Sequence, residues 1–139
     1  MVHSKKTRTT ARSIRILIVD DHPVVLQALQ DWLTRTKLFD VVGACSSAAE
    51  ALACLEDRSP EIVLLDANMP QISGLEAVPL IKQRRPSLPV VIMSLDDARV
   101  AAARQMPSVD GVLHKEQLIG EFPPLACRLC LLERIEADY

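Results

Sequence analysis

The chain has no apolar run that approaches the ~20 residues a membrane-spanning helix requires. Its basic N-terminus is followed only by a short apolar stretch, residues 14–19, and then by two acids. A signal peptide would carry a longer apolar segment before its cleavage site. We therefore expect no membrane contact and a cytoplasmic location.

The four cysteines do not form a metal site or a disulfide framework. Cys127 and Cys130 make a lone C-x-x-C, and no second pair of ligands exists at similar spacing for zinc. This pair lies within an apolar, helix-like segment, whereas a redox pair would open a helix just after a strand. Because free cysteine is among the most buried residue types, we expect core packing and a reducing compartment.

The first fifteen residues contain no acid, although the net charge of the whole chain is −2. Five of the sixteen basic residues lie in this segment, so the remainder carries 11 basic against 18 acidic residues. The chain after residue 15 is therefore net acidic, and a net acidic surface is poorly suited to bind nucleic acid. Residues 1–13 show no hydrophobic period and predict a disordered basic tail, followed by one domain over residues 14–139.

Apolar runs bounded by turn-forming residues alternate with segments of helical period, and there are no internal repeats. Strands are predicted at 14–19, 39–44, 61–66, 90–94 and 109–114, with helices at about 23–35, 48–57, 75–85, 98–105 and 123–137. This alternation indicates an α/β fold with a parallel sheet and right-handed crossovers. The expected architecture is a flavodoxin-like (βα)5 doubly wound sheet with strand order 2-1-3-4-5.

Prolines punctuate two of the predicted helices. Pro79 falls within the third helix, where its ring and missing N–H should kink the helix or delay its start. Pro123 and Pro124 precede an apolar helical period and predict the first turn of the last helix.

Polar side chains follow the predicted strands at one edge of the sheet. Asp20 and Asp21 follow the first strand and Asp66 ends the third, while Ser94 and Lys115 follow the fourth and fifth. In an open parallel sheet this edge holds the ligand crevice. Taken alone, Asp66 is explained equally well as a turn residue.

Three converging carboxylates would repel one another without a cation. Oxygen ligands favour Mg²⁺ over zinc or copper, and Mg²⁺ completes its shell with water and phosphate oxygens. A carboxylate such as Asp66 can attack a phosphoryl group to form an acyl phosphate. Lys115 and the metal would neutralise the transferring group, and Ser94 would donate its hydroxyl to it. The pattern predicts a phosphoryl-acceptor site.

From about Ile14 to Arg134 the chain resembles the receiver domain of bacterial two-component response regulators. The motifs are VDDHP at 19–23, LLDANMP at 64–70, GLEAV at 74–78, VVIMS at 90–94 and GVLHK at 111–115. The segments VDDHPVVLQAL and VVGACSSAAEAL are most similar to the subfamily that carries a LuxR-type helix-turn-helix after the receiver.

The resemblance implies a role for each site residue. Asp66 would be the phospho-acceptor, and Mg²⁺ would be held by Asp20, Asp21, Asp66 and the backbone carbonyl of Asn68. Ser94 would be the switch hydroxyl, and Lys115 would pair with the phosphoryl group.

The same resemblance implies partners. The phosphoryl donor would be a histidine kinase, and DNA would be bound only through a domain absent from this chain. A homodimer is possible through the apolar last helix, residues 125–132.

Three features depart from the family pattern. Val112 stands three residues before Lys115, where the family has Tyr or Phe, so the aromatic part of the switch is missing. The interval from Ser94 to Lys115 is about one residue short, and Pro79 interrupts the third helix. These departures alter the surface through which the family transmits its signal, whereas all of the acceptor-site residues are present.

Two other functions remain as alternatives to a non-enzymatic receiver. A pseudo-receiver would act as an interaction module without phosphorylation, which Val112 and the short fourth helix favour. A Mg²⁺-dependent phosphatase with an aspartyl nucleophile would need an acid two residues after Asp66, where this chain has Asn68. His22 is interpreted as a loop residue beside the site and His114 as a strand residue, and neither has metal partners at ligand spacing.

Overall fold

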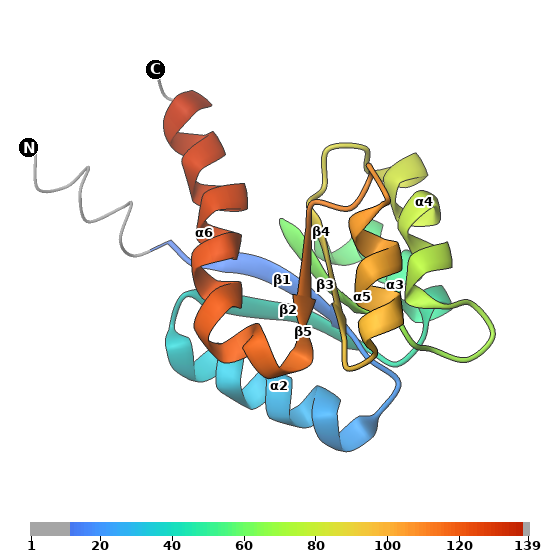
Figure 1. The fold of residues 1–139 in the computed structure, drawn as a ribbon. Helices are drawn as coiled ribbons and strands as arrows, with labels where there is room; N and C mark the ends of the chain where they lie inside the picture. Colours follow the sequence, from blue (N-terminus) through green and yellow to red (C-terminus); the bar gives the residue numbers. More distant parts are fainter. Residues whose placement is uncertain (1–11, 138–139) are drawn as a thin grey trace, which may run out of the picture.

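Five parallel strands form a single sheet in the order β2-β1-β3-β4-β5 (Figure 1). The computed structural model describes the backbone of residues 12–137 and the side chains of residues 12–130. The strands are β1 (Ile14–Val19), β2 (Phe39–Cys45), β3 (Ile62–Asp66), β4 (Val90–Ser94) and β5 (Gly111–His114). The predicted flavodoxin-like order is confirmed, so β1 and β3 are neighbours at the centre.

Helices cover both faces of the sheet (Figure 1). They are α2 (Pro23–Thr36), α3 (Ala48–Arg58), α4 (Gly74–Arg84), α5 (Asp97–Arg104) and α6 (Leu118–Ala137), with a single 3-10 turn, η1 (Lys115–Gln117), before α6. No helix within residues 12–137 is long and apolar enough to cross a membrane.

Side-chain alternation along β1 divides the core into two layers. Ile16 and Ile18 pack with residues of α2 and α6, whereas Leu17 and Val19 pack with residues of α3 and α4. All five residues of β3 are buried, as expected for a central parallel strand covered on both faces. Packing in the two layers positions the strands, and the strand ends then determine where the site residues lie.

The N-termini of α3 and α4 are capped by serine side chains. Ser47 Oγ accepts the backbone N–H of Glu50 at 3.2 Å and so caps α3. Ser73 and Glu76 form a reciprocal capping box that starts α4 at Gly74. Such a cap contributes about 1 kcal/mol to helix stability.

Gly74 brings the start of α4 directly against the end of β3. A Cβ atom at position 74 would lie 1.9 Å from the backbone oxygen of Asp66, closer than any side chain can approach. The Gly74 N–H also donates to the Ala67 carbonyl at 3.0 Å. A residue without a side chain is therefore required where the loop after Asp66 folds back.

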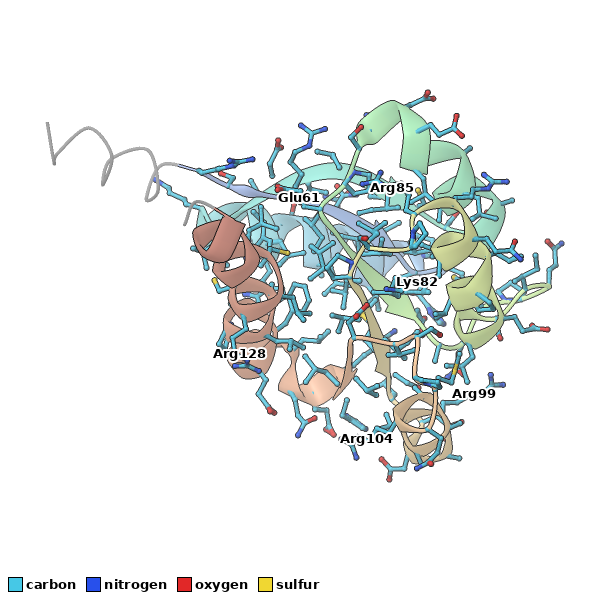
Figure 2. The ribbon with its side chains drawn as sticks, turned by 90° about the horizontal axis from the view of Figure 1, so that it is seen from above. Glu61, Lys82, Arg85, Arg99, Arg104 and Arg128 are labelled. Carbon is cyan, nitrogen blue, oxygen red and sulfur yellow. The ribbon has the colours of Figure 1, made fainter. Side chains whose placement is uncertain are left out.

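Lys82 fastens α4 to the opposite edge of the sheet (Figure 2). Its Nζ donates to Asp110 Oδ2 and to the Leu88 carbonyl, each at 2.7 Å. Asp110 Oδ2 also accepts the backbone N–H of Val90 at 2.8 Å. This clamp holds the amino ends of β4 and β5, so α4 is anchored at both of its ends.

Two predictions at element boundaries were wrong, and a third was wrong in one of its alternatives. Pro79 does not delay the third helix, because the Ser73–Glu76 box starts α4 ahead of it, while the alternative of a kink at Pro79 stays a prediction. Pro123 and Pro124 lie inside α6 and do not open it, since α6 begins at Leu118 and buries Leu118 and Phe122 against the sheet. The fifth strand begins at Gly111, because the Val109 N–H turns back to the Met106 carbonyl.

The predicted core role of the C-x-x-C pair is confirmed. Cys130 is buried and Cys127 is half-buried, and both pack with residues of the layer that α2 and α6 cover. The predicted tail falls mostly on residues 1–11, which lie outside the described part of the chain.

Candidate functional site

Four of the predicted residues lie together at the carboxyl edge of the central strands, namely Asp20, Asp21, Asp66 and Lys115. Asp20 follows β1 and is held there by its N–H, which donates to the Cys45 carbonyl at 3.0 Å. Asp66 ends β3 beside Met93 of β4. Asp20 and Asp66 are both buried, with exposed fractions of 0% and 1%.

Lys115 joins the two buried carboxylates. Its Nζ lies 2.8 Å from Asp20 Oδ2 and 3.3 Å from Asp66 Oδ2. The lysine side chain is itself 12% exposed, so water screens these interactions little. The strand order therefore brings residues 95 positions apart in sequence into direct contact.

Burial and charge act in opposite directions on these groups. Burial raises the pKa of Asp66, the backbone N–H of Asn68 opposes this effect, and the charge of Asp20 adds to it. Burial also opposes ionisation of Asp20, but hydrogen bonds from Lys115 and His22 outweigh it and lower the pKa of Asp20. Burial lowers the pKa of Lys115, and the two carboxylates more than compensate, so that this pKa is raised.

An oxygen of Asp21 marks a place for a cation. Asp21 Oδ1 is fully enclosed and accepts no hydrogen bond from the described residues. One ligand atom from each of Asp20, Asp21, His22 and Asp66 lies within 4.8 Å of the other three. A divalent cation would coordinate this oxygen and neutralise the excess negative charge, and carboxylate oxygens are the ligands that Mg²⁺ takes.

His22 lies beside the site, as predicted, but its ring comes closer to the carboxylates than the sequence interpretation expected. Its Nδ1 lies 3.0 Å from Asp20 Oδ1 and 3.2 Å from Asp21 Oδ1. The hydrogen bond to Asp20 and the charge of Asp21 raise the pKa of His22. Its position directly after the two acids was the available signal.

Asn68 lies in the loop after Asp66, and Ser94 is the last residue of β4. The Asn68 N–H donates to Asp66 Oδ1 at 3.0 Å, while a metal contact by its carbonyl stays a prediction. Ser94 is fully buried at the end of β4, and its Oγ accepts the Asp96 N–H at 3.0 Å. A hydroxyl that accepts this bond keeps its own proton free to donate.

Val112 lies within the core and not at the site. It is paired with Ile92 of β4 and packs, half-buried, in the layer under α3, α4 and α5.

Comparison with known proteins identifies the fold family. The profile of the response regulator receiver domain matches residues 16–122. The transcriptional regulatory protein MctR of Rhizobium johnstonii is 35% identical over 91 residues, which cover 66% of this chain and 42% of MctR.

A second relative and a solved structure extend the comparison. A protein-glutamate methylesterase/protein-glutamine glutaminase of Trichodesmium erythraeum is 38% identical over 89 residues, which cover 64% of this chain and 25% of that protein. The chain thus spans less than half the length of either relative. A structure of two RcsB dimers bound to two parallel DNAs has a TM-score of 0.74 at 23% identity, covering 84% of this chain and 60% of that one. At this identity the structural likeness supports the fold.

Proposed function

The chain belongs to the response regulator receiver domain family, and from that premise we propose that it accepts a phosphoryl group on Asp66 in a two-component signalling pathway. The observation that carries this proposal is the buried pair of Asp20 and Asp66, joined by Lys115 at the carboxyl edge of the sheet. This arrangement offers a nucleophilic carboxylate beside a fixed positive charge, as phosphoryl transfer requires.

In the proposed reaction a carboxylate oxygen of Asp66 attacks the phosphorus of a histidine kinase's phosphohistidine. The P–N bond breaks, the imidazole leaves with the bonding electrons, and an acyl phosphate remains on Asp66. Lys115 Nζ lies 3.3 Å from the attacking group and would follow the phosphoryl oxygens. Ser94 would donate its hydroxyl proton to one of them.

Asp20, Asp21, Asp66 and the Asn68 carbonyl would hold Mg²⁺. When bound, Mg²⁺ would supply the positive charge that neutralises the phosphoryl oxygens. Asp21 Oδ1 supports this assignment, since it is enclosed and accepts no hydrogen bond from the described residues.

The output in this proposal is transcription in the cytoplasm. The relative MctR is named as a transcriptional regulator and extends well beyond the segment that matches this chain. A LuxR-type helix-turn-helix domain, which is not in this chain, would bind DNA. The chain itself would act as a signalling domain and not as an enzyme.

A small acyl phosphate with Mg²⁺, read by intact mass, tests the proposal. We expect wild type to gain the mass of one phosphoryl group and Asp66→Asn to gain none. Asp57→Asn, an exposed acid on α3, serves as the matched control and should be phosphorylated like wild type. Absence of both an adduct and Mg²⁺ binding in the millimolar range would contradict the proposal.

The packing of Val112 favours one second candidate. With the aromatic switch residue replaced by a core valine, the chain could serve as a pseudo-receiver whose partner binding ignores phosphate. The two functions differ in the response to phosphorylation, because a pseudo-receiver would keep the same oligomeric state whether or not Asp66 carries a phosphoryl group. A phosphatase would instead release phosphate steadily from organic monoesters, and the Asn68 amide offers no acid or base for that reaction.

A further inference from the structure

Two cysteine side chains meet where α3 packs on the end of β2. Cys45 is the last residue of β2 and is 2% exposed, whereas Cys54 lies in α3 and is half-buried. Their Sγ atoms are 3.5 Å apart, although the two residues are nine positions apart in the sequence. Both are free thiols. The pair is therefore reduced, with its two sulfurs in direct contact.

Neighbouring contacts hold both sulfurs in place. Cys45 is paired with Val19 of β1, and its carbonyl accepts the Asp20 N–H at 3.0 Å. A Cβ atom at Gly43 would lie 3.7 Å from Cys54 Sγ, so this sulfur lies against the backbone of β2. The S–S bond of a disulfide is about 2.05 Å long, and the two atoms need to approach by only about 1.5 Å to form one.

The two thiols differ in exposure and in acidity. Burial raises the pKa of Cys45 to about 12, and the hydrogen bond and the charge of Cys54 add to this effect. Cys45 therefore keeps its proton and can donate it to Cys54 Sγ. An oxidant in solvent reaches Cys54 first, because Cys45 is enclosed. This arrangement suits an attacking thiol with a second thiol held behind it.

From this geometry we propose that Cys45 and Cys54 form an oxidation site, which hydrogen peroxide converts into a disulfide between β2 and α3. The Cys54 thiolate attacks one oxygen of the peroxide, the O–O bond breaks, hydroxide leaves with the bonding electrons, and a sulfenic acid remains on Cys54. The Cys45 sulfur then attacks the Cys54 sulfur, the S–O bond breaks, and the hydroxyl group leaves with the Cys45 proton as water. The two sulfurs lose two electrons in total. The peroxide becomes two waters, because the hydroxide takes up the proton that Cys54 released.

In a reducing compartment such a disulfide is transient and forms in response to an oxidant. It would join α3 to the end of β2, where the Cys45 carbonyl accepts the Asp20 N–H. The inference goes beyond the proposed function, which uses neither cysteine.

Oxidation of the full chain, followed by alkylation of the remaining thiols, tests this site by intact mass. We expect four alkylated thiols in untreated wild type and two after treatment with hydrogen peroxide, with four again after dithiothreitol. Glutamyl endopeptidase cleaves after Glu50, which lies between the two cysteines. The two fragments should therefore stay joined until a reductant is added.

Single replacements distinguish the two thiols. Cys54→Ser should keep its three thiols through the treatment, because the attacking sulfur is lost. Cys45→Ala should stop at a sulfenic acid on Cys54, which dimedone captures. The half-buried Cys127 of the other pair provides the matched control, and Cys127→Ser should form the same disulfide as wild type.

Several results would overturn the inference. Four alkylated thiols in treated wild type would do so, as would the loss of two thiols in Cys54→Ser. A sulfinic acid on Cys54 with Cys45 still alkylated would show that Cys45 does not reach the oxidised sulfur. A disulfide that is absent from Cys127→Ser would assign the oxidation to the other pair.

Discussion

Lys115 compensates the charge of two buried carboxylates, and this has a consequence for stability. We expect Lys115→Met to lower the free energy of unfolding at neutral pH by about 3 kcal/mol, because it leaves Asp20 and Asp66 buried without a cation. Chemical denaturation in the presence of a metal chelator measures the difference. Arg104→Gln, which changes an exposed cation on α5 (Figure 2), should have little effect.

The loss should depend on pH in a direction set by the shifted pKa values. Asp20 has a lowered pKa in the folded protein, so its contribution is present above its unfolded pKa and is lost as the pH falls through the folded value. Lys115 has a raised pKa, so its contribution is present below its unfolded pKa and is lost as the pH rises through the folded value. The difference between wild type and Lys115→Met should therefore be greatest near neutrality. An equal difference at pH 3 and pH 7 would contradict this account.

At the residue scale the acids and the lysine were predictable, and the histidine was not. Asp20, Asp66 and Lys115 each follow an apolar run that has to be a strand, and parallel strands end at one edge. The direction of the His22 ring depends on φ and ψ at an N-cap, which no residue pattern specifies.

At the scale of single elements, the helix α4 contains a proline at an interior position, where proline lowers helix stability. Pro79 is exposed in the interior of this helix, where it offers no N–H to the preceding turn. We expect Pro79→Ala to raise the free energy of unfolding by about 2 kcal/mol, because alanine restores the bond and removes the ring. Thermal unfolding followed by circular dichroism measures the gain.

Pro86 offers a matched control for Pro79. It lies in the turn between α4 and β4 and is exposed. Pro86→Ala should lower stability slightly, since it frees the unfolded chain without gaining a bond. A loss of stability in Pro79→Ala would show that the proline is required where it stands.

The errors at element boundaries share one physical reason. The prolines of α6 indicate a helix start at Pro123, but burial of Leu118 and Phe122 against the sheet extends the helix backward over that point. Local propensity predicts where a helix can begin, whereas packing decides where it does. The same holds for α4, whose capping box outweighs the later proline.

Across the whole molecule the fold was predictable because alternating strands and helices allow few arrangements. The short crossovers require parallel strands, and burial of both faces requires helices on each side. The result is two core layers, one on each face of the sheet. On β1, Ile16 packs in one layer and Leu17 in the other. What the pattern does not contain is the surface by which copies of the chain would meet.

Dimer formation is a prediction at this scale. Leu125 and Leu129, which belong to the segment predicted for self-association, pack partly on their own core, while Ile119 at the start of α6 is 74% exposed. We expect the apparent mass to double when wild type is treated with acyl phosphate and Mg²⁺, and size-exclusion chromatography with light scattering measures it. Asp66→Asn should keep one mass throughout. An unchanged mass in phosphorylated wild type would contradict the prediction and favour the pseudo-receiver.

The central place of β3 determines how a signal can leave Asp66. This strand is bonded on one side to β1 and on the other to β4, and every one of its residues is buried. Amides in such a strand exchange with solvent only when most of the molecule opens, whereas the surrounding loops open far more easily. A covalent change at Asp66 is therefore fixed to the least mobile part of the protein. The change at Asp66 must therefore reach other parts of the molecule through small displacements of the neighbouring loops, while β3 itself stays in place.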